Sequence, residues 1–168
     1  MSFEIKRLSE ENSASVAEIE KLCFSNPWSE GTVASEIESG FSDFFGAFSE
    51  EKLAGYIGGR TIAGETEIFN VAVLPEFRRK GIAKALIEKF IDAVREKSTD
   101  VIFLEVRASN LAAISLYEKF GFKTVGFRKN CGYKHGKWHS VVFMEKQLNE
   151  FSVPPKAIVP IGELEYEF

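Results

Sequence analysis

A basic turn with one glycine is the stretch of this sequence best suited to bind an anion. It spans Arg78 to Ala83, follows an apolar strand-like run that ends at Leu74, and precedes an amphipathic helical pattern over Ala83 to Lys97. The first turn of a helix has unpaired N–H groups and a partial positive charge, and Gly81 allows close approach to the backbone. The turn therefore predicts a phosphate-binding site, with an ordinary solvated turn as the alternative.

Two further side chains have types and surroundings that favour proton transfer. Glu105 interrupts the apolar strand predicted from Val101 to Val106, where a carboxylate is costly unless it is partnered or functional. Tyr117 lies in the helix predicted from Asn110 to Phe120, which returns beside that strand. A carboxylate can accept a proton and a tyrosine hydroxyl can donate one, so the two residues could serve general acid–base chemistry. The alternatives are a surface ion pair for Glu105 and a core position for Tyr117.

The composition narrows the class of protein. A chain of 168 residues, 45% hydrophobic and 27% charged, suits one soluble globular domain. A net charge of −4 argues against nucleic-acid binding, and no apolar run of about 18 residues predicts a membrane span. Cys23 and Cys131 have neither the number nor the spacing of a metal site or a disulfide framework, so we expect reduced thiols in a cytoplasmic protein and no metal. No oligomeric state is predicted.

The elements that must position these residues alternate along the chain, which favours an α/β fold with a mixed sheet. The expected strands cover residues 3–8, 44–48, 53–62, 67–74, 101–106, 122–128 and 140–146. The expected helices cover residues 10–22, 29–39, 83–97 and 110–120. Gly58-Gly59 indicates a bulge, and Gly132 to His139 reads as a turn-rich connection. We expect a domain over residues 1–148 and a tail over 149–168.

Three separated blocks resemble the GCN5-related N-acetyltransferases (GNAT), and in particular their branch that acetylates the terminal alanine of ribosomal proteins. The blocks are Cys23 to Ser29, the basic turn, and Leu104 to Tyr117, and the resemblance covers about residues 3 to 148. It implies a GNAT fold with a mixed, mostly antiparallel sheet of six to seven strands flanked by about four helices. It also implies acetyl-CoA as cosubstrate and a primary amine as acceptor, first of all a protein N-terminus.

The resemblance assigns roles to individual residues. Glu105 would be the general base and Tyr117 the general acid, with Glu67 as a rival base because other acetyltransferases of this superfamily place theirs there. The cofactor-binding residues would be those that offer backbone groups to pantetheine, Val71, Ala72 and Val73; those that wrap the pyrophosphate, Arg79, Lys80, Gly81, Ile82, Ala83 and Lys84; and Asn110.

The C-terminal third departs from that branch. Gly132 to Phe143 is similar to the phosphinothricin and amino-acid N-acetyltransferases, and His139 and Ser140 stand where the alanine-acetylating branch has an acidic pair. A small-molecule amine is therefore the alternative acceptor. A non-catalytic CoA-binding protein is the alternative of another class, and the presence of both Glu105 and Tyr117 argues against it.

Overall fold

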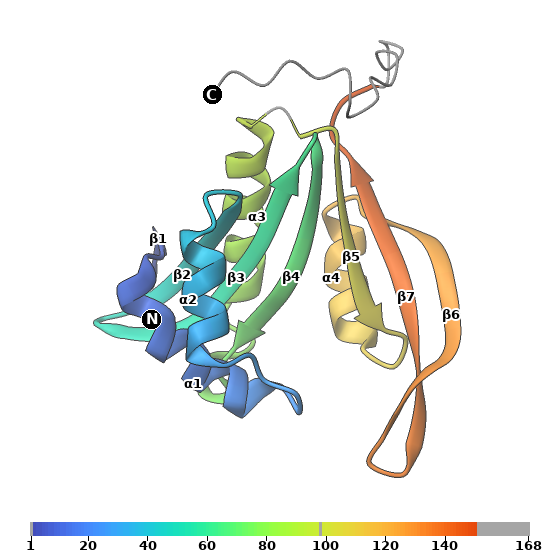
Figure 1. The fold of residues 1–168 in the computed structure, drawn as a ribbon, viewed down its shortest axis with the longest axis horizontal. Helices are drawn as coiled ribbons and strands as arrows, with labels where there is room; N and C mark the ends of the chain where they lie inside the picture. Colours follow the sequence, from blue (N-terminus) through green and yellow to red (C-terminus); the bar gives the residue numbers. More distant parts are fainter. Residues whose placement is uncertain (1, 98, 151–168) are drawn as a thin grey trace, which may run out of the picture.

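A seven-stranded mixed sheet forms the centre of the molecule (Figure 1). The structure is a computed structural model that describes residues 2–97 and 99–150. The strands, in the spatial order β1-β2-β3-β4-β5-β7-β6, are β1 (Glu4–Arg7), β2 (Ser42–Ser49), β3 (Lys52–Ile62), β4 (Glu65–Val73), β5 (Val101–Arg107), β7 (Lys137–Gln147) and β6 (Lys123–Lys134). The helices are α1 (Ser13–Cys23), α2 (Glu30–Glu38), α3 (Ile82–Arg95) and α4 (Leu111–Lys119). The predicted α/β class and the mostly antiparallel sheet are confirmed.

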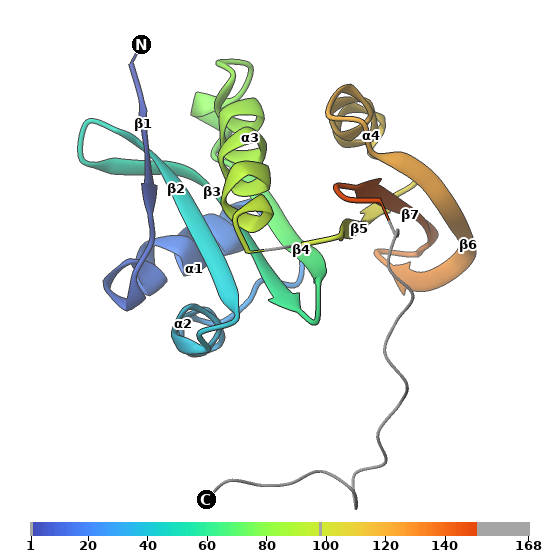
Figure 2. The same ribbon diagram turned by 90° about the horizontal axis from the view of Figure 1, so that it is seen from above.

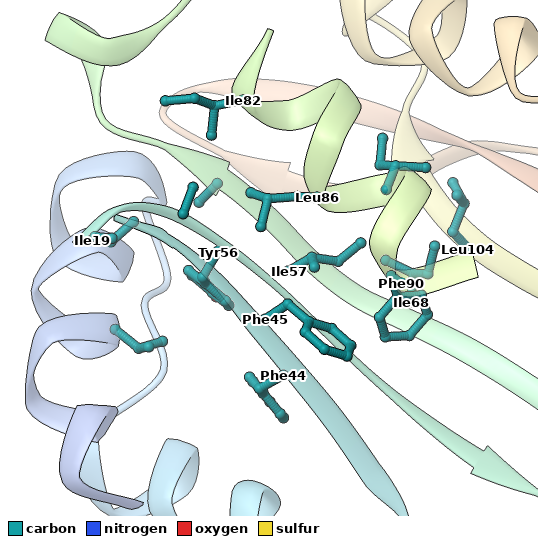
Figure 3. Close-up of a cluster of buried hydrophobic side chains, with 14 of the residues drawn as sticks. Ile19, Phe44, Phe45, Tyr56, Ile57, Ile68, Ile82, Leu86, Phe90 and Leu104 are labelled. Carbon is teal, nitrogen blue, oxygen red and sulfur yellow. The ribbon is translucent and has the colours of Figure 1, made fainter. Parts of the chain in front are cut away.

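Helices cover both faces of the sheet, with α1 and α2 on one side and α3 and α4 on the other (Figure 2). The helix α3 turns one apolar face to the sheet, and its Leu86 and Phe90 are fully buried beside Ile57 and Ile68 (Figure 3). Each large apolar side chain buried in this way stabilises the fold by about 1.5–3 kcal/mol. This packing holds the N-terminus of α3 in a fixed place at the end of β4.

The strands β4 and β5 form the one parallel pair among the described strands, and they pair over only four residues. The register runs from Glu65 opposite Val101 to Ile68 opposite Leu104. Beyond that point the two strands separate, while β5 stays paired with β7 through Arg107 (Figure 1). The backbone edges of β4 and β5 that face each other are therefore free of ladder partners over their C-terminal halves.

A bulge in β4 lies where this separation begins. Gly58 is opposite Asn70 and Gly59 is opposite Ile68, which leaves Phe69 as the extra residue. A Cβ atom on Gly59 would lie 2.4 Å from the Glu67 carbonyl oxygen, and one on Gly58 would lie 2.3 Å from the Phe44 ring. The bulge predicted from the two glycines is confirmed, and both positions need glycine because they are crowded.

The region from Gly132 to His139 differs from the turn-rich connection expected from the sequence. It is the end of a long hairpin in which β6 and β7 continue to a two-residue turn at His135 and Gly136, whose φ angles are 50° and 73°. Tyr133 and Trp138 pair across the strands with ring centroids 5.2 Å apart. We call this projecting part of β6 and β7, residues 128–141, the hairpin arm.

The helix boundaries follow the capping residues. Ser29 Oγ accepts a hydrogen bond from the Thr32 backbone at 3.1 Å, as the predicted cap of α2 requires. The first helix is shorter than expected, because Glu10–Asn12 forms a separate 3₁₀ turn before α1 begins at Ser13. Asn149 Nδ2 donates to the Thr99 carbonyl at 3.0 Å, and residues 151–168 of the expected tail lie outside the described residues.

Candidate active site

A cavity of about 450 Å³ occupies the space between the separated ends of β4 and β5. Its walls come from the end of α1 and the segment after it, β4 from Phe69 to Val71, β5 from Glu105 to Arg107, the first two turns of α4 with their cap, and Lys134 at the end of β6. The structure thus brings Glu105, Asn110 and Tyr117 to one cavity, although they lie on a strand, at a helix cap and in a helix.

The two rival carboxylates lie on the same face of the sheet. Glu67 is opposite Phe103 in the parallel ladder, so Glu105, two residues further along β5, points to the same side. The pKa of Glu67 is raised, first by partial burial and then by the negative charge of Glu105, while Arg60 lowers it. Of the two, Glu105 lines the cavity. Of the two carboxylates, Glu105 is therefore the one placed to contact a molecule bound in the cavity.

The Tyr117 side chain is buried with its ring against Phe122, at a centroid distance of 5.6 Å. Burial raises the pKa of Tyr117 to about 12. The hydroxyl group therefore keeps its proton near pH 7 and can donate it into the cavity that Tyr117 lines.

Asn110 caps α4, because its Oδ1 accepts a hydrogen bond from the Ala113 backbone at 3.2 Å. It also lines the cavity, so the cap and a contact with a bound molecule are compatible.

The basic turn closes a second cavity of about 450 Å³, between the N-terminus of α3 and α4. Gly81 precedes α3 in the left-handed conformation, with φ 83°, and Arg79 also has a positive φ, 62°. The predicted cofactor-binding residues that line this cavity are Val73, Arg79, Gly81, Ile82, Ala83 and Lys84. Lys80 faces elsewhere, since its Nζ donates to the Glu76 carbonyl at 2.7 Å.

The backbone groups of the predicted pantetheine-binding residues in β4 point in alternating directions. The Leu74 N–H donates to the Ala54 carbonyl of β3 at 2.9 Å, so strand alternation turns the backbone groups of Ala72 toward β3 as well. The backbone groups of Val71 and Val73 then face the opening toward β5. Arg78 Nε donates to the Val73 carbonyl at 2.9 Å and lines the second cavity. Arg78, the first residue of the basic turn, thus joins the turn to the strand.

The wall of the cavity that contains Trp28 also involves residues that the sequence did not single out, which are Phe69, Arg60 and Glu20. The ring of Phe69 lies 5.3 Å from that of Trp28 and 5.4 Å from the guanidinium of Arg60, which forms an ion pair with Glu36 of α2. Glu20 of α1 lies beneath this wall and is fully buried. Its position four residues after Val16, on the buried face of α1, is the signal that could have identified it.

A family model for the acetyltransferase (GNAT) family matches residues 13–122. The chain belongs to this family. This GNAT chain is 38% identical over 112 residues to the ribosomal protein bS18-alanine N-acetyltransferase of Escherichia coli K12, which covers 67% of this chain and 75% of the relative. The predicted fold and family are thereby confirmed, and the chain is an acetyltransferase.

Solved structures agree with this assignment. The ribosomal-protein-S18-alanine N-acetyltransferase from Escherichia coli superposes with a TM-score of 0.82 and 29% identity, covering 91% of this chain and 99% of that one. A Salmonella typhimurium structure that contains acetyl-CoA has the same fold, with a TM-score of 0.81 and 22% identity. The superposition covers 94% of this chain and 100% of that one. Across residues 2–97 and 99–150, this GNAT chain has no helix both long and apolar enough to cross a membrane.

Proposed function

We propose that this GNAT enzyme transfers the acetyl group of acetyl-CoA to the N-terminal α-amine of a protein, with a ribosomal protein as the first candidate. The observation that carries the proposal is the meeting of Glu105, Asn110 and Tyr117 in the cavity between β4 and β5. The names of the relatives support the same class of acceptor, since the compared enzymes modify the alanine of a ribosomal protein.

Acetyl-CoA fits the two neighbouring cavities as a substrate. Its pyrophosphate suits the N-terminus of α3, where Arg79 and Lys84 add positive charge and Gly81 leaves the backbone open, with no atom within 4 Å of an added Cβ. Its pantetheine arm is an extended chain with amide groups, which suits the backbone of Val71 and Val73, because these residues face the opening toward β5 and have no strand partner there, although Arg78 donates to the Val73 carbonyl. The thioester would then lie in the first cavity, near Glu105 and Tyr117.

The reaction is a direct attack within a ternary complex. The neutral amine attacks the thioester carbonyl, a C–N bond forms and the C–S bond breaks. Glu105, directly or through a water, takes the proton that the amine loses, and Tyr117 gives a proton to the departing thiolate. An α-amine has a pKa of about 7.7–8.0 against about 10.4 for lysine, so near pH 7 it needs far less help to lose its proton.

The hairpin arm supports a protein acceptor over a small one. The arm extends beyond the end of β5 (Figure 1) and contributes Lys134 to the cavity wall, whereas Trp138 is 61% exposed and does not line the cavity. The mouth of the cavity can therefore admit an extended chain.

One observation favours the alternative, a small amino acid. Arg107 and Lys134 also line the cavity, and such cations would bind the free carboxylate of an amino acid. Such an acceptor agrees with the similarity of the C-terminal third to the phosphinothricin and amino-acid N-acetyltransferases. The roles proposed for Glu105 and Tyr117 would be the same for this acceptor.

A thiol-release assay tests the proposal. Acetyl-CoA is incubated with the enzyme and either a peptide that begins with alanine, free amino acids, or no acceptor. We expect CoA release to depend on the peptide. Tight CoA binding with no release in any mixture would instead indicate a non-catalytic CoA-binding protein. We also propose a cytoplasmic location. Cys23 and Cys131 are free thiols, and free thiols are typical of proteins in a reducing compartment.

A further inference from the structure

A buried carboxylate without an ion-pair partner lies behind the wall of the first cavity. The described residues give Glu20 three hydrogen-bond donors and no Lys or Arg partner. Its Oε2 accepts from the Trp28 backbone N–H at 2.7 Å, and its Oε1 accepts from Asn70 Nδ2 at 3.0 Å and from the Tyr56 hydroxyl. Burying a carboxylate is costly unless its lone pairs are satisfied, so this arrangement depends on all three donors.

The donors come from the elements that form the acceptor side of the cavity. Trp28 belongs to the segment between α1 and α2, and Asn70 directly follows the bulge residue Phe69 in β4. Trp28, Phe69 and Asn70 all line the cavity. Tyr56 lies on β3 beneath them, and its pKa is raised by burial and by the bond to Glu20, so it remains a donor.

One carboxylate therefore fixes both partners of the aromatic pair. Trp28 is held through its own amide, and Phe69 is held through its neighbour Asn70. The two rings meet at 5.3 Å with an interplanar angle of 50°, and that contact sets the shape of the wall. The phosphate-binding cavity shares none of these residues.

We propose that Glu20 is a positioning residue for the acceptor amine, acting through Trp28 and Phe69. The proposal rests on the proposed function in that the molecule it positions is the acceptor of acetyl transfer. Glu20 does not touch the reacting atoms, and it holds the wall against which the acceptor lies while Glu105 takes the proton. Binding of CoA, whose pyrophosphate lies at α3, is separate from this wall.

Glu20→Gln is the informative substitution because it keeps the side-chain volume. A glutamine amide has one acceptor oxygen and one NH₂ donor, so it cannot accept from three donors held at both carboxylate oxygens. The NH₂ group would face the Trp28 N–H or the Asn70 amide, and the aromatic wall would lose its tether. We expect the acceptor KM to rise about tenfold, equivalent to about 1.4 kcal/mol, while the Kd for CoA stays within about twofold.

Asp43→Asn is the matched control. Asp43 is also a buried carboxylate, 1% exposed, but it lies on β2 and pairs with Arg7 at 2.5 Å and Lys97 at 2.7 Å, outside both cavities. It should lower the melting temperature without moving the acceptor KM. If Glu20→Gln behaves in the same way, Glu20 is merely structural and the proposal is wrong. Asn70→Ala keeps the carboxylate and two of its donors, so it tests the same tether if Glu20→Gln does not fold.

A second readout does not depend on the acceptor. Trp28 and Trp138 are the two tryptophans of the chain, so Trp138→Phe leaves Trp28 as the single fluorophore. In that background, Glu20→Gln should increase acrylamide quenching of Trp28 at least twofold, and Asp43→Asn should not. Unchanged quenching would overturn the positioning role. If the wild-type enzyme acetylates no peptide but Glu20→Gln still increases the quenching of Trp28, the proposed function is wrong, while the positioning of Trp28 by Glu20 is supported.

Discussion

Glu105 and Glu67 are the two candidates for the general base of this site, and substitutions can show which of them has that role. Glu105→Gln keeps the shape of the cavity and removes the base, so turnover at pH 7 should fall about 10²-fold, the usual scale for a general base. The loss should shrink as the pH rises above about 8, because an α-amine is then already neutral. Thiol release measured from pH 6 to pH 9.5, with the Kd for CoA measured in parallel, checks both parts.

Glu67→Gln is the matched control for this prediction, since Glu67 carries the same charge on the same face of the sheet. It should leave turnover within about threefold of wild type. If Glu105→Gln retains full turnover at pH 7 and Glu67→Gln loses it, Glu67 is the base.

The electrostatic coupling between the two carboxylates can be measured directly. A neighbouring negative charge disfavours the ionised form, and Glu105 raises the pKa of Glu67 in this way. In Glu105→Gln that charge is gone, so the pKa of Glu67 should fall, and partial burial should still hold it above the ordinary range. Carbon-13 NMR titration of the glutamate carboxyl groups tests this, and an unchanged Glu67 titration would mean that the two groups do not interact.

Tyr117→Phe tests the acid. The substitution keeps the ring and its contact with Phe122, so the melting temperature should change little. It removes the proton held by a hydroxyl whose pKa is about 12, so turnover should fall at least tenfold. A sharp drop in melting temperature with normal activity per folded molecule would make Tyr117 a core residue.

The sequence singled out Glu105 and Tyr117 by their residue types and surroundings, and the resemblance to the GNAT family added Asn110; the structure brings all three to one cavity. Glu20 and Arg60 left weaker signals in the sequence. A glutamate is common in helices, and only the packing of α1 on β3 and β4 shows that Glu20 is fully buried. Arg60 supports the cavity wall through its ion pair with Glu36 and its contact with the ring of Phe69. Both partners lie on other elements, so the sequence around Arg60 does not reveal these contacts.

At the scale of elements, we predict that cofactor binding depends on the junction between β4 and α3. Gly81 has φ 83°, a conformation that side chains other than glycine rarely adopt, and a valine there would also stand where the pyrophosphate approaches the helix. Gly81→Val should weaken acetyl-CoA binding more than tenfold, by about 1.4 kcal/mol or more, as measured by calorimetry.

Gly40→Val provides the control for strain alone. Gly40 has φ 73° and, like Gly81, no atom within 4 Å of an added Cβ, but it lies between α2 and β2, away from both cavities. It should cost comparable stability and leave cofactor affinity unchanged. Equal affinity losses in both variants would mean that the turn at Gly81 has no special role in binding acetyl-CoA.

The order of the elements followed from periodicity, whereas their ends and separations did not. The alternation of strands and helices along the chain predicted the mixed sheet, but the point where β4 leaves β5 depends on the bulge at Phe69, which only the pairing with β3 reveals. The hairpin arm was missed because glycine and polar residues suggested a loop. Its strands are joined by the tight turn at His135 and Gly136 and by the Tyr133–Trp138 pair, which a local reading of turn residues does not include.

On the scale of the whole molecule, the sheet opens between β4 and β5, and its two halves give the site different sides. Cofactor binding is assigned to the side of α3 and α4, and the acceptor to the side of α1, α2 and the hairpin arm (Figure 2). The acceptor side contains Glu105, which lines the cavity, and Glu67, which lies on the same face of the sheet and does not line it. A free amino acid would bring a carboxylate next to its amine and meet like charge, while a peptide carries a neutral amide at that position.

This difference yields a graded prediction for acceptors. Alaninamide removes the carboxylate of free alanine and should raise kcat/KM, and a tetrapeptide that begins with alanine should raise it at least tenfold further by contacts along the open mouth, about 1.4 kcal/mol. The first step isolates charge, and the second isolates the contacts that only a chain can make. Steady-state rates for the three acceptors at fixed acetyl-CoA measure both steps. Free alanine as the best of the three would reverse the argument, because Arg107 and Lys134 would then bind its carboxylate and the enzyme would be of the small-acceptor type.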